Sequence, residues 1–201
     1  MKKTFSLLLP LLFLLSFSVP PTGGGYAVGD TAQDFSLKNV NGKMVSLSSL
    51  KKAKGYIVIF TCNHCPYAKA YEQRIIELDQ KYASLGFPVV AINSNDKDVQ
   101  PADNFDNMKK RAKEKNYPFL YLYDETQEVA RAFGATRTPH VYLLDQNRVV
   151  RYIGAIDDNS EEPSMVKEKY LANAVDALIA GQEVSVKETK AIGCGIKWKK
   201  S

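Results

Sequence analysis

Five consecutive apolar residues, Tyr56-Ile57-Val58-Ile59-Phe60, lead directly into a Cys-x-x-Cys pair, Cys62 and Cys65. A continuous apolar run of this length is typical of a strand buried on both faces of a parallel sheet. From Pro66 onward, apolar residues recur at spacings of three and four, which predicts an amphipathic helix of about five turns ending at Gly86. The sequence therefore predicts a strand-to-helix junction that carries two cysteines.

Strand-like and helix-like segments alternate through the rest of the chain. Two short alternating segments, 34–37 and 44–47, flank the turn Asn41-Gly42 and predict an opening β-hairpin. A closing hairpin is predicted from 140–144 and 149–153. Together these patterns indicate an α/β fold with a central mixed sheet flanked by helices. The remaining predicted elements are strands at 87–92 and 119–123, and helices from near Pro101, from Glu125 to Phe133 and from about Met165 to Ala180.

Length and composition favour one soluble globular domain. A chain of 201 residues can bury one ordinary core, and 45% hydrophobic with 24% charged residues is an ordinary balance. The net charge of +5 comes without a dense stripe of lysine and arginine, so we expect no nucleic-acid partner.

The N-terminus has the layout of a secretory signal peptide. Lys2 and Lys3 supply a positive start, residues 7–17 are mostly apolar, and Gly23-Gly24-Gly25 follows. The apolar run is short for a transmembrane helix, although an uncleaved anchor stays open as an alternative. Either form predicts a periplasmic or otherwise extracytoplasmic domain, which after cleavage would not span the membrane. The expected organisation is a signal peptide and glycine-rich linker at 1–25, a redox domain at 26–181 and a tail at 182–201.

The spacing of the Cys-x-x-Cys pair favours a redox-active role over that of a structural disulfide. A disulfide between such close residues closes a tiny loop and adds little stability. A thiol near a helix N-terminus faces free backbone N–H groups and the positive end of the helix dipole, which stabilise the thiolate. We therefore predict Cys62 as the nucleophile and Cys65 as the resolving cysteine that attacks a mixed disulfide at Cys62. His64 would add a cationic or hydrogen-bonding partner for the thiolate.

A second motif, Thr138-Pro139, begins the closing hairpin. Proline at a strand start is a candidate for a cis peptide bond. His140 follows directly and either begins the strand or joins the site. Cys194, between two glycines, is a third thiol without a partner in the motif. Three alternatives stay open: it is inert, it resolves a disulfide with another partner, or it forms an intermolecular disulfide. Two thiols and two imidazoles also suit Cu(I) or Zn(II), although a structural zinc site normally has four closely arranged ligands.

Several of these stretches resemble the thioredoxin superfamily. Residues 33–37 with Asn41-Gly42-Lys43 resemble the opening hairpin of extracytoplasmic thioredoxin-like proteins. Cys62-Asn63-His64-Cys65 and Thr138-Pro139 resemble the superfamily's dithiol and cis-proline loop. The insertion at 93–123 resembles the peroxiredoxin-like branch, the AhpC/TSA-type redoxins. The resemblance implies a thioredoxin-like fold with an N-terminal β-hairpin and an insertion after the second core strand. It also implies that Thr138 presents backbone groups to an extended substrate, with Pro139 against the cysteines.

The chain departs from the family patterns at three places. Thr61 lies where thioredoxin has tryptophan, and Tyr56 lies where it has a buried acid, so the sequence identifies no carboxylate for proton transfer. The Pro-x-x-x-Thr-x-x pattern that precedes a peroxidatic cysteine fits neither Cys62 nor Cys65.

The function predicted from the sequence is that of an exported thiol–disulfide oxidoreductase. It would use Cys62, Cys65 and His64 for catalysis and Thr138 and Pro139 for substrate binding, without a cofactor or a bound metal. Its expected partners are protein or small thiol and disulfide substrates and a membrane or soluble thiol redox partner. Two alternatives remain, a peroxiredoxin-like peroxidase and a copper-binding or metal-delivery module on the same fold.

Overall fold

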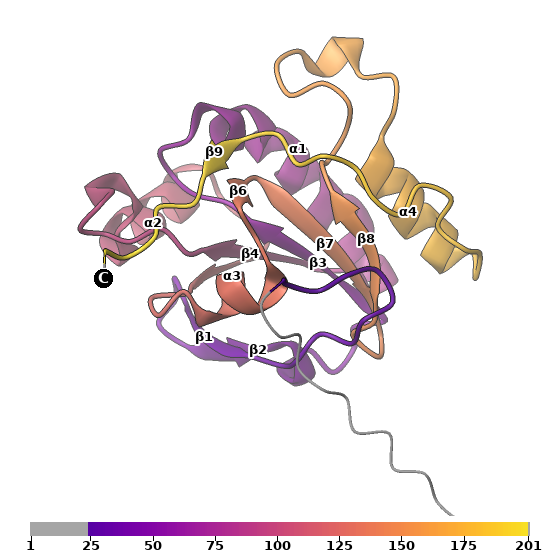
Figure 1. The fold of residues 1–201 in the computed structure, drawn as a ribbon, viewed down its shortest axis with the longest axis horizontal. Coiled ribbons are helices and arrows are strands. Elements are labelled where there is room, and N and C mark those ends of the chain that lie inside the picture. The colour runs from indigo at the N-terminus through magenta and orange to yellow at the C-terminus, as the bar shows by residue number, and fades with distance from the viewer. Residues whose placement is uncertain (1–23, 201) are drawn as a thin grey trace, which may run out of the picture.

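Seven strands form a mixed central sheet in the computed structural model of the chain, which describes residues 24–200 (Figure 1). The predicted signal peptide lies almost wholly outside the described residues. The strand order is β2-β1-β5-β4-β3-β7-β8, and this confirms the predicted mixed sheet. The strands are β1 (Ser36–Asn39), β2 (Met44–Ser46), β3 (Gly55–Phe60), β4 (Val89–Asn93), β5 (Leu120–Tyr123), β7 (His140–Asp145) and β8 (Val150–Gly154).

Strand β3 lies near the middle of the sheet because its side chains are apolar on both faces. All six of its residues are buried. It pairs in parallel with β4, where Val58 faces Val90, and antiparallel with β7, where Val58 faces Tyr142. β4 in turn pairs in parallel with β5. The carboxyl ends of three neighbouring parallel strands therefore meet at one edge, which is where α/β proteins commonly place their sites.

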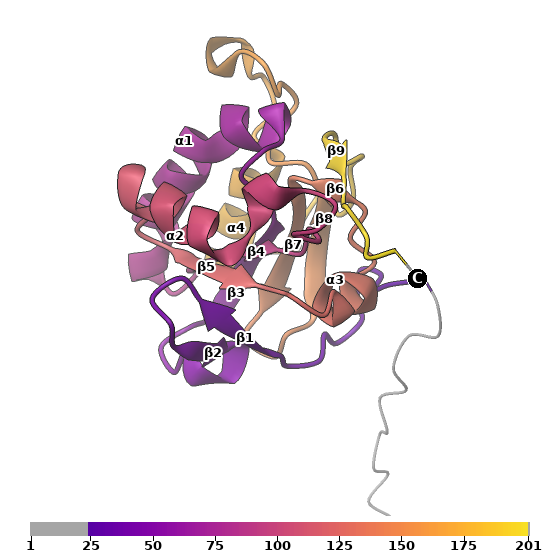
Figure 2. The same cartoon turned by 90° about the vertical axis from the view of Figure 1, so that its left-hand side faces the viewer.

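Helices cover both faces of this sheet, and Figure 2 shows α1, α2 and α4 on one side and α3 on the other. Ile57 and Ile59 of β3 belong to the core under the first group of helices, and Val58 and Phe60 belong to the core under α3. Successive side chains of β3 point to opposite faces of the sheet and thus contribute to two hydrophobic cores. The helices are α1 (Pro66–Tyr82), α2 (Phe105–Glu114), α3 (Glu128–Phe133) and α4 (Tyr170–Ile179).

Three helices begin later than the sequence pattern predicts, and one of them, α3, begins at Glu128 instead of Glu125. The segment from Pro101 forms only a 3-10 turn as far as Asp103, and α2 begins at Phe105 after the side chain of Asn104 caps it. The last helix begins at Tyr170 instead of Met165. Its preceding residues are extended and bond elsewhere, since the N–H of Asp158 donates to the carbonyl of Glu168 at 3.1 Å. A long-range pairing replaces the helical bonds that the local pattern predicts.

The C-terminal segment returns across the molecule toward the sheet edge. Val184 and Ile196 are buried, and β9 (Cys194–Gly195) pairs antiparallel with β6 (Arg137–Thr138). Figure 1 shows this segment in yellow beside β6. The tail is therefore part of the packed structure over its described length. Within residues 24–200, no helix has the length and apolar character needed to cross a membrane.

Candidate active site

Cys62 and Cys65 lie in the turn between β3 and α1. Cys65 is the N-cap of α1, and Pro66 occupies the first helical position, where its missing N–H costs nothing. The helix N-terminus therefore faces Cys65 more directly than Cys62. Both thiols are buried, with 4% of Cys62 and none of Cys65 exposed, so Cys62 is the more accessible of the two.

Thr138 joins the two cysteines to the loop before β7. Its hydroxyl Oγ1 lies 3.3 Å from the Sγ of Cys62, and its carbonyl oxygen lies 3.2 Å from the Sγ of Cys65. The peptide bond between Thr138 and Pro139 is cis, as expected. The structure thus brings Thr138 to two cysteines that lie 73 and 76 positions earlier in the chain.

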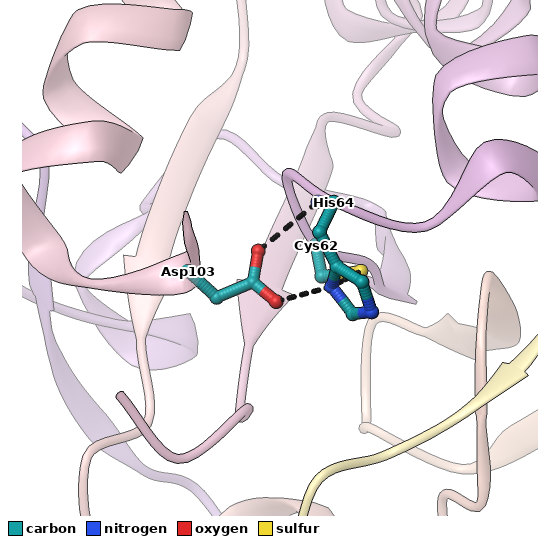
Figure 3. A group of neighbouring side chains, drawn as sticks. All are labelled: Cys62, His64 and Asp103. Atoms are coloured by element: carbon teal, nitrogen blue, oxygen red, sulfur yellow. Dashed lines mark hydrogen bonds and ion pairs between the residues drawn. The ribbon is translucent and has the colours of Figure 1, made fainter. Parts of the chain in front are cut away.

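A buried carboxylate, that of Asp103, holds the turn between the cysteines. Its Oδ1 accepts the backbone N–H of Asn63 at 2.7 Å and that of His64 at 3.2 Å. Its Oδ2 lies 2.5 Å from Nδ1 of His64 (Figure 3). Because an ionised carboxylate only accepts hydrogen bonds, Nδ1 carries the proton in this pair. The same nitrogen lies 3.5 Å from the Sγ of Cys62, so His64 lies between carboxylate and sulfur.

The side chain of Asn63 fastens the same turn to two further elements. Its Nδ2 donates to the carbonyl of Ala102 at 2.9 Å, and its Oδ1 accepts from the hydroxyl of Tyr121 at 2.9 Å. Both bonds are inside the protein, where an unpaired amide would be costly. Asn63 therefore has a structural reason for its place between the two cysteines.

The two cysteines interact, and each shifts the pKa of the other. The pKa of Cys65 is lowered to about 4, first by a hydrogen bond from Cys62 and then, against the effect of burial, by hydrogen bonds from Cys194 and the Ala68 amide. The pKa of Cys62 is raised by its bond with Cys65, by burial and by the negative charge of Asp103. The hydroxyl of Thr138 acts the other way and lowers the pKa of Cys62.

His140 begins β7 and is buried behind the cis-proline loop. Burial lowers its pKa to about 4, so the ring is neutral near pH 7. Its Nδ1 accepts the backbone N–H of Thr136 at a long 3.4 Å, and its ring packs on Tyr142 with centroids 4.8 Å apart. These contacts place His140 in the core, as the start of a strand.

Cys194 lies against the dithiol. It packs on the cluster formed by Cys62, Cys65 and Ala68, and it faces Thr138 in the register of β6 and β9. Burial and contact with Cys65 raise the pKa of Cys194 to about 11. All three cysteines of the chain therefore meet at one point.

One group among the described residues offers metal-ligating atoms close together, namely Cys62, His64 and Asp103. Its oxygen atoms are already occupied, because Asp103 accepts from two backbone amides, from His64 and from Nδ2 of Asn95 at 2.7 Å. A bound cation would have to displace the bond between Nδ1 and Oδ2, because a nitrogen that carries a proton cannot coordinate a metal. The arrangement suits a hydrogen-bonded network better than a metal centre.

Asp103 is the residue that sequence reasoning missed. It follows β4 by ten residues, in the loop at the carboxyl end of a strand adjacent to β3. Loops after neighbouring parallel strands meet at the same edge of the sheet, and this is the signal that could have identified it. Asp103 supplies a buried carboxylate from the 3-10 turn after β4, whereas thioredoxin carries its acid on the strand before the dithiol.

Comparison with known proteins agrees with this geometry. The Redoxin family model matches residues 27–169. Chloroplastic peroxiredoxin Q from Oryza sativa subsp. japonica is 28% identical over 137 residues, covering 65% of this chain and 59% of the relative. The match thus spans less than two thirds of that relative.

Two solved structures extend the comparison. An uncharacterized conserved protein from Geobacillus kaustophilus is 41% identical with a TM-score of 0.83, over 89% of this chain and 96% of that one. A thiol:disulfide interchange protein of the thioredoxin family from Chlorobium tepidum TLS is 28% identical with a TM-score of 0.54, over 64% and 87% of the two chains. On the family match, the fold and the dithiol at the strand-to-helix junction, the chain belongs to the Redoxin family of the thioredoxin superfamily.

Proposed function

We propose that this redoxin is an exported thiol–disulfide oxidoreductase whose redox centre is the dithiol of Cys62 and Cys65. The observation that carries the proposal is the position of Thr138, which contacts both sulfur atoms from the cis-proline loop. A loop that touches both thiols fixes where a substrate disulfide would have to approach. The helix N-terminus at Cys65 and the lowered pKa of that thiol supply a thiolate near neutral pH.

The two cysteines have different roles in the reaction because their solvent exposure differs. Cys62, the more exposed, attacks one sulfur of a substrate disulfide as its proton passes to Cys65, and the other substrate sulfur leaves as a thiolate. Cys65 then attacks the sulfur of Cys62, the mixed disulfide breaks and the second substrate thiol leaves. Two electrons and the proton of Cys62 pass from the dithiol to the substrate, the second substrate thiolate takes its proton from solvent, and the reverse sequence oxidises substrate thiols.

His64 and Asp103 act as positioning residues in this proposal. Asp103 holds the backbone of the turn and the imidazole of His64 at once, so the nitrogen beside Cys62 has a fixed place. An imidazole protonated on both nitrogens would put a positive charge 3.5 Å from the sulfur and favour its thiolate. The thiol of Cys62 can also pass its proton to Cys65 without a carboxylate relay.

The location and partners in this proposal follow from the N-terminal sequence. A positive start, a short apolar run and small residues support export to the periplasm or another extracytoplasmic space. Protein disulfides or small disulfides would be substrates there, and a membrane or soluble thiol protein would restore the dithiol. Secretion of a fusion with a reporter enzyme, with and without residues 1–25, tests the export step.

A trapping experiment tests the reaction. In Cys65→Ala the mixed disulfide at Cys62 cannot be resolved, so substrates remain attached and appear as higher bands on non-reducing gels. Cys62→Ala is the matched control and should trap nothing. The purified wild-type protein should also reduce the disulfides of insulin in the presence of dithiothreitol. Equal trapping by the two variants, or none by either, contradicts the proposal.

Peroxidase activity is the second candidate, because the chain matches peroxiredoxin Q over 137 residues. In that reaction the thiolate of Cys62 attacks a peroxide, releases hydroxide or an alkoxide and becomes a sulfenic acid, which Cys65 converts to the disulfide with loss of water. Rapid peroxide consumption that needs Cys62 but not Cys65 for its first turnover would favour this candidate. Slow consumption together with insulin reduction would favour the oxidoreductase.

A further inference from the structure

We infer that Cys194 is a third redox-active cysteine, which forms a disulfide with Cys65 by exchange with the Cys62–Cys65 disulfide. This inference rests on the proposed function, since it needs the dithiol to be oxidised first. It assigns a chemical role to Cys194, which lies more than 125 positions after Cys62 and Cys65 in the chain.

The backbone of the C-terminal segment puts Cys194 at the site. β9 pairs with β6 so that Cys194 faces Thr138, the residue that contacts both dithiol sulfurs. Gly193 approaches Thr138 so closely that an added Cβ would lie 2.2 Å from its carbonyl oxygen. The segment therefore occupies the edge where the resemblance to thioredoxins places an extended substrate.

The segment is held by hydrogen bonds on the C-terminal side of the cysteine. The N–H of Ile196 donates to the carbonyl of Thr136 at 3.2 Å, and the N–H of Lys197 donates to Oδ1 of Asn95 at 2.7 Å. Nδ2 of Asn95 donates in turn to Asp103, so one side chain links the tail to the site. These hydrogen bonds fix the position of Cys194 in the folded chain.

Cys194 packs on the cluster formed by Cys62, Cys65 and Ala68. After burial, its interaction with Cys65 contributes to the raised pKa of Cys194. Cys194 is partly exposed, whereas Cys65 is fully buried. The thiol of Cys194 therefore lies within the site, in the position of a substrate thiol.

The exchange balances without any external reagent. After the dithiol has reduced a substrate, the Cys194 thiolate attacks the sulfur of Cys65. The Cys65–Cys194 bond forms, the Cys62–Cys65 bond breaks, and Cys62 leaves as a thiolate that takes the proton lost by Cys194. No electrons are gained or lost. The new disulfide ties the tail to the helix N-terminus and frees Cys62, the accessible cysteine.

Peptide mapping tests the inference directly. Trypsin cuts after Lys54 and Lys69 and after Lys190 and Lys197, so Cys62 and Cys65 share one peptide and Cys194 lies on another. The full chain is oxidised with one equivalent of diamide, free thiols are blocked at acid pH with N-ethylmaleimide, and the digest is analysed without reduction. We expect a disulfide that links the two peptides, with the blocking group on Cys62.

Single substitutions distinguish a Cys65–Cys194 disulfide from a Cys62–Cys194 disulfide, since both would join the same two peptides. Cys62→Ser should still form the linked peptides when oxidised, and Cys65→Ser should form them at least about fivefold less, because the exchange joins Cys194 to Cys65. Cys194→Ser should keep its Cys62–Cys65 disulfide and its fold, checked by circular dichroism. A wild-type linked fraction no higher than that of Cys65→Ser overturns the inference.

The same samples keep this inference apart from the proposed function. If wild type forms a Cys62–Cys65 disulfide and reduces insulin but shows no linked peptides, only the role of Cys194 fails. If neither disulfide forms and insulin is not reduced, the proposed function fails and the inference fails with it.

Discussion

Nδ1 of His64 lies 2.5 Å from the carboxylate of Asp103, a residue 39 positions later in the sequence. The same carboxylate accepts the backbone N–H groups of Asn63 and His64, so one buried side chain fixes both the backbone and the imidazole of the turn. The negative charge so placed also raises the pKa of Cys62. Asp103 therefore orders the turn and raises the pKa of Cys62, the proposed nucleophile, at the same time.

Replacing Asp103 by Asn should make Cys62 more acidic. The amide removes the negative charge but keeps an oxygen for the two backbone N–H groups, and the pKa of Cys62 should fall by about one unit. The measurement is the pH dependence of iodoacetamide reaction at Cys62, in a Cys65→Ser background so that one thiol titrates. An unchanged or higher midpoint in a folded variant would mean that the charge of Asp103 does not reach the sulfur.

Thr138→Val should have the opposite effect on the same thiol. Valine keeps the branched shape of threonine but removes the hydroxyl that lies 3.3 Å from Sγ and lowers the pKa of Cys62. The pKa should rise by about half a unit to one unit, because a hydrogen bond to the thiolate is lost. The same alkylation profile in the Cys65→Ser background measures it. A fall would contradict the hydroxyl's role as donor.

Gly193→Ala should uncover Cys62. The added Cβ would lie 2.2 Å from the carbonyl oxygen of Thr138, so β9 must move away from the edge that covers the thiols. We expect the alkylation rate of Cys62 at neutral pH to rise about tenfold, as local opening becomes easier.

Gly195→Ala is the matched control for that experiment. It lies two residues away, and an added Cβ there meets no atom within 4 Å. Its alkylation rate should stay near that of the wild type. Equal rates for the wild type and both variants would show that β9 does not control access to the site.

Stability should fall in acid because of His140. Its pKa is about 4 in the folded chain against an ordinary value of 6.5, so between these values the unfolded chain binds a proton that the folded chain does not. The stability that comes from keeping the ring neutral is therefore complete above about pH 6.5 and is lost as the pH falls through 4. Between about pH 7 and pH 4.5 the expected loss from this residue is about 2 kcal/mol.

Urea unfolding of His140→Asn measures this contribution. The Oδ1 of asparagine can still accept the N–H of Thr136 but does not titrate in this range. The variant should lose about 2 kcal/mol less than the wild type over the same pH interval, whatever its stability at neutral pH. Parallel pH profiles for the two proteins would show that His140 is not the titrating group.

Local sequence patterns predicted the scaffold of the site well. The buried run of β3 and the spacing of three and four in α1 extend over many residues, so they are strong signals and their elements appear at nearly the expected bounds. The start of the last helix was wrong by five residues, because Asp158 bonds to Glu168 and keeps the chain extended there. Such a pairing across a loop leaves no periodic trace in the sequence.

The contacts around the dithiol were only partly predictable. Cys62, Cys65, Thr138 and Pro139 were found from short motifs, and the structure brings them together. Asp103 lies in a polar loop with no motif of its own, and its role depends on the order of strands in the sheet. The place of Cys194 depends on a two-residue strand, too short for any pattern to indicate.

The reaction of the dithiol with glutathione tests the central claim most directly. The purified protein is equilibrated in buffers of graded ratio of reduced to oxidised glutathione, and free thiols are counted by mass after alkylation. We predict one reversible transition in which two thiols are lost together, and in which Cys62→Ser abolishes the Cys62–Cys65 disulfide. A protein whose Cys62 and Cys65 stay reduced across the whole range, or form only adducts with glutathione, would contradict the account.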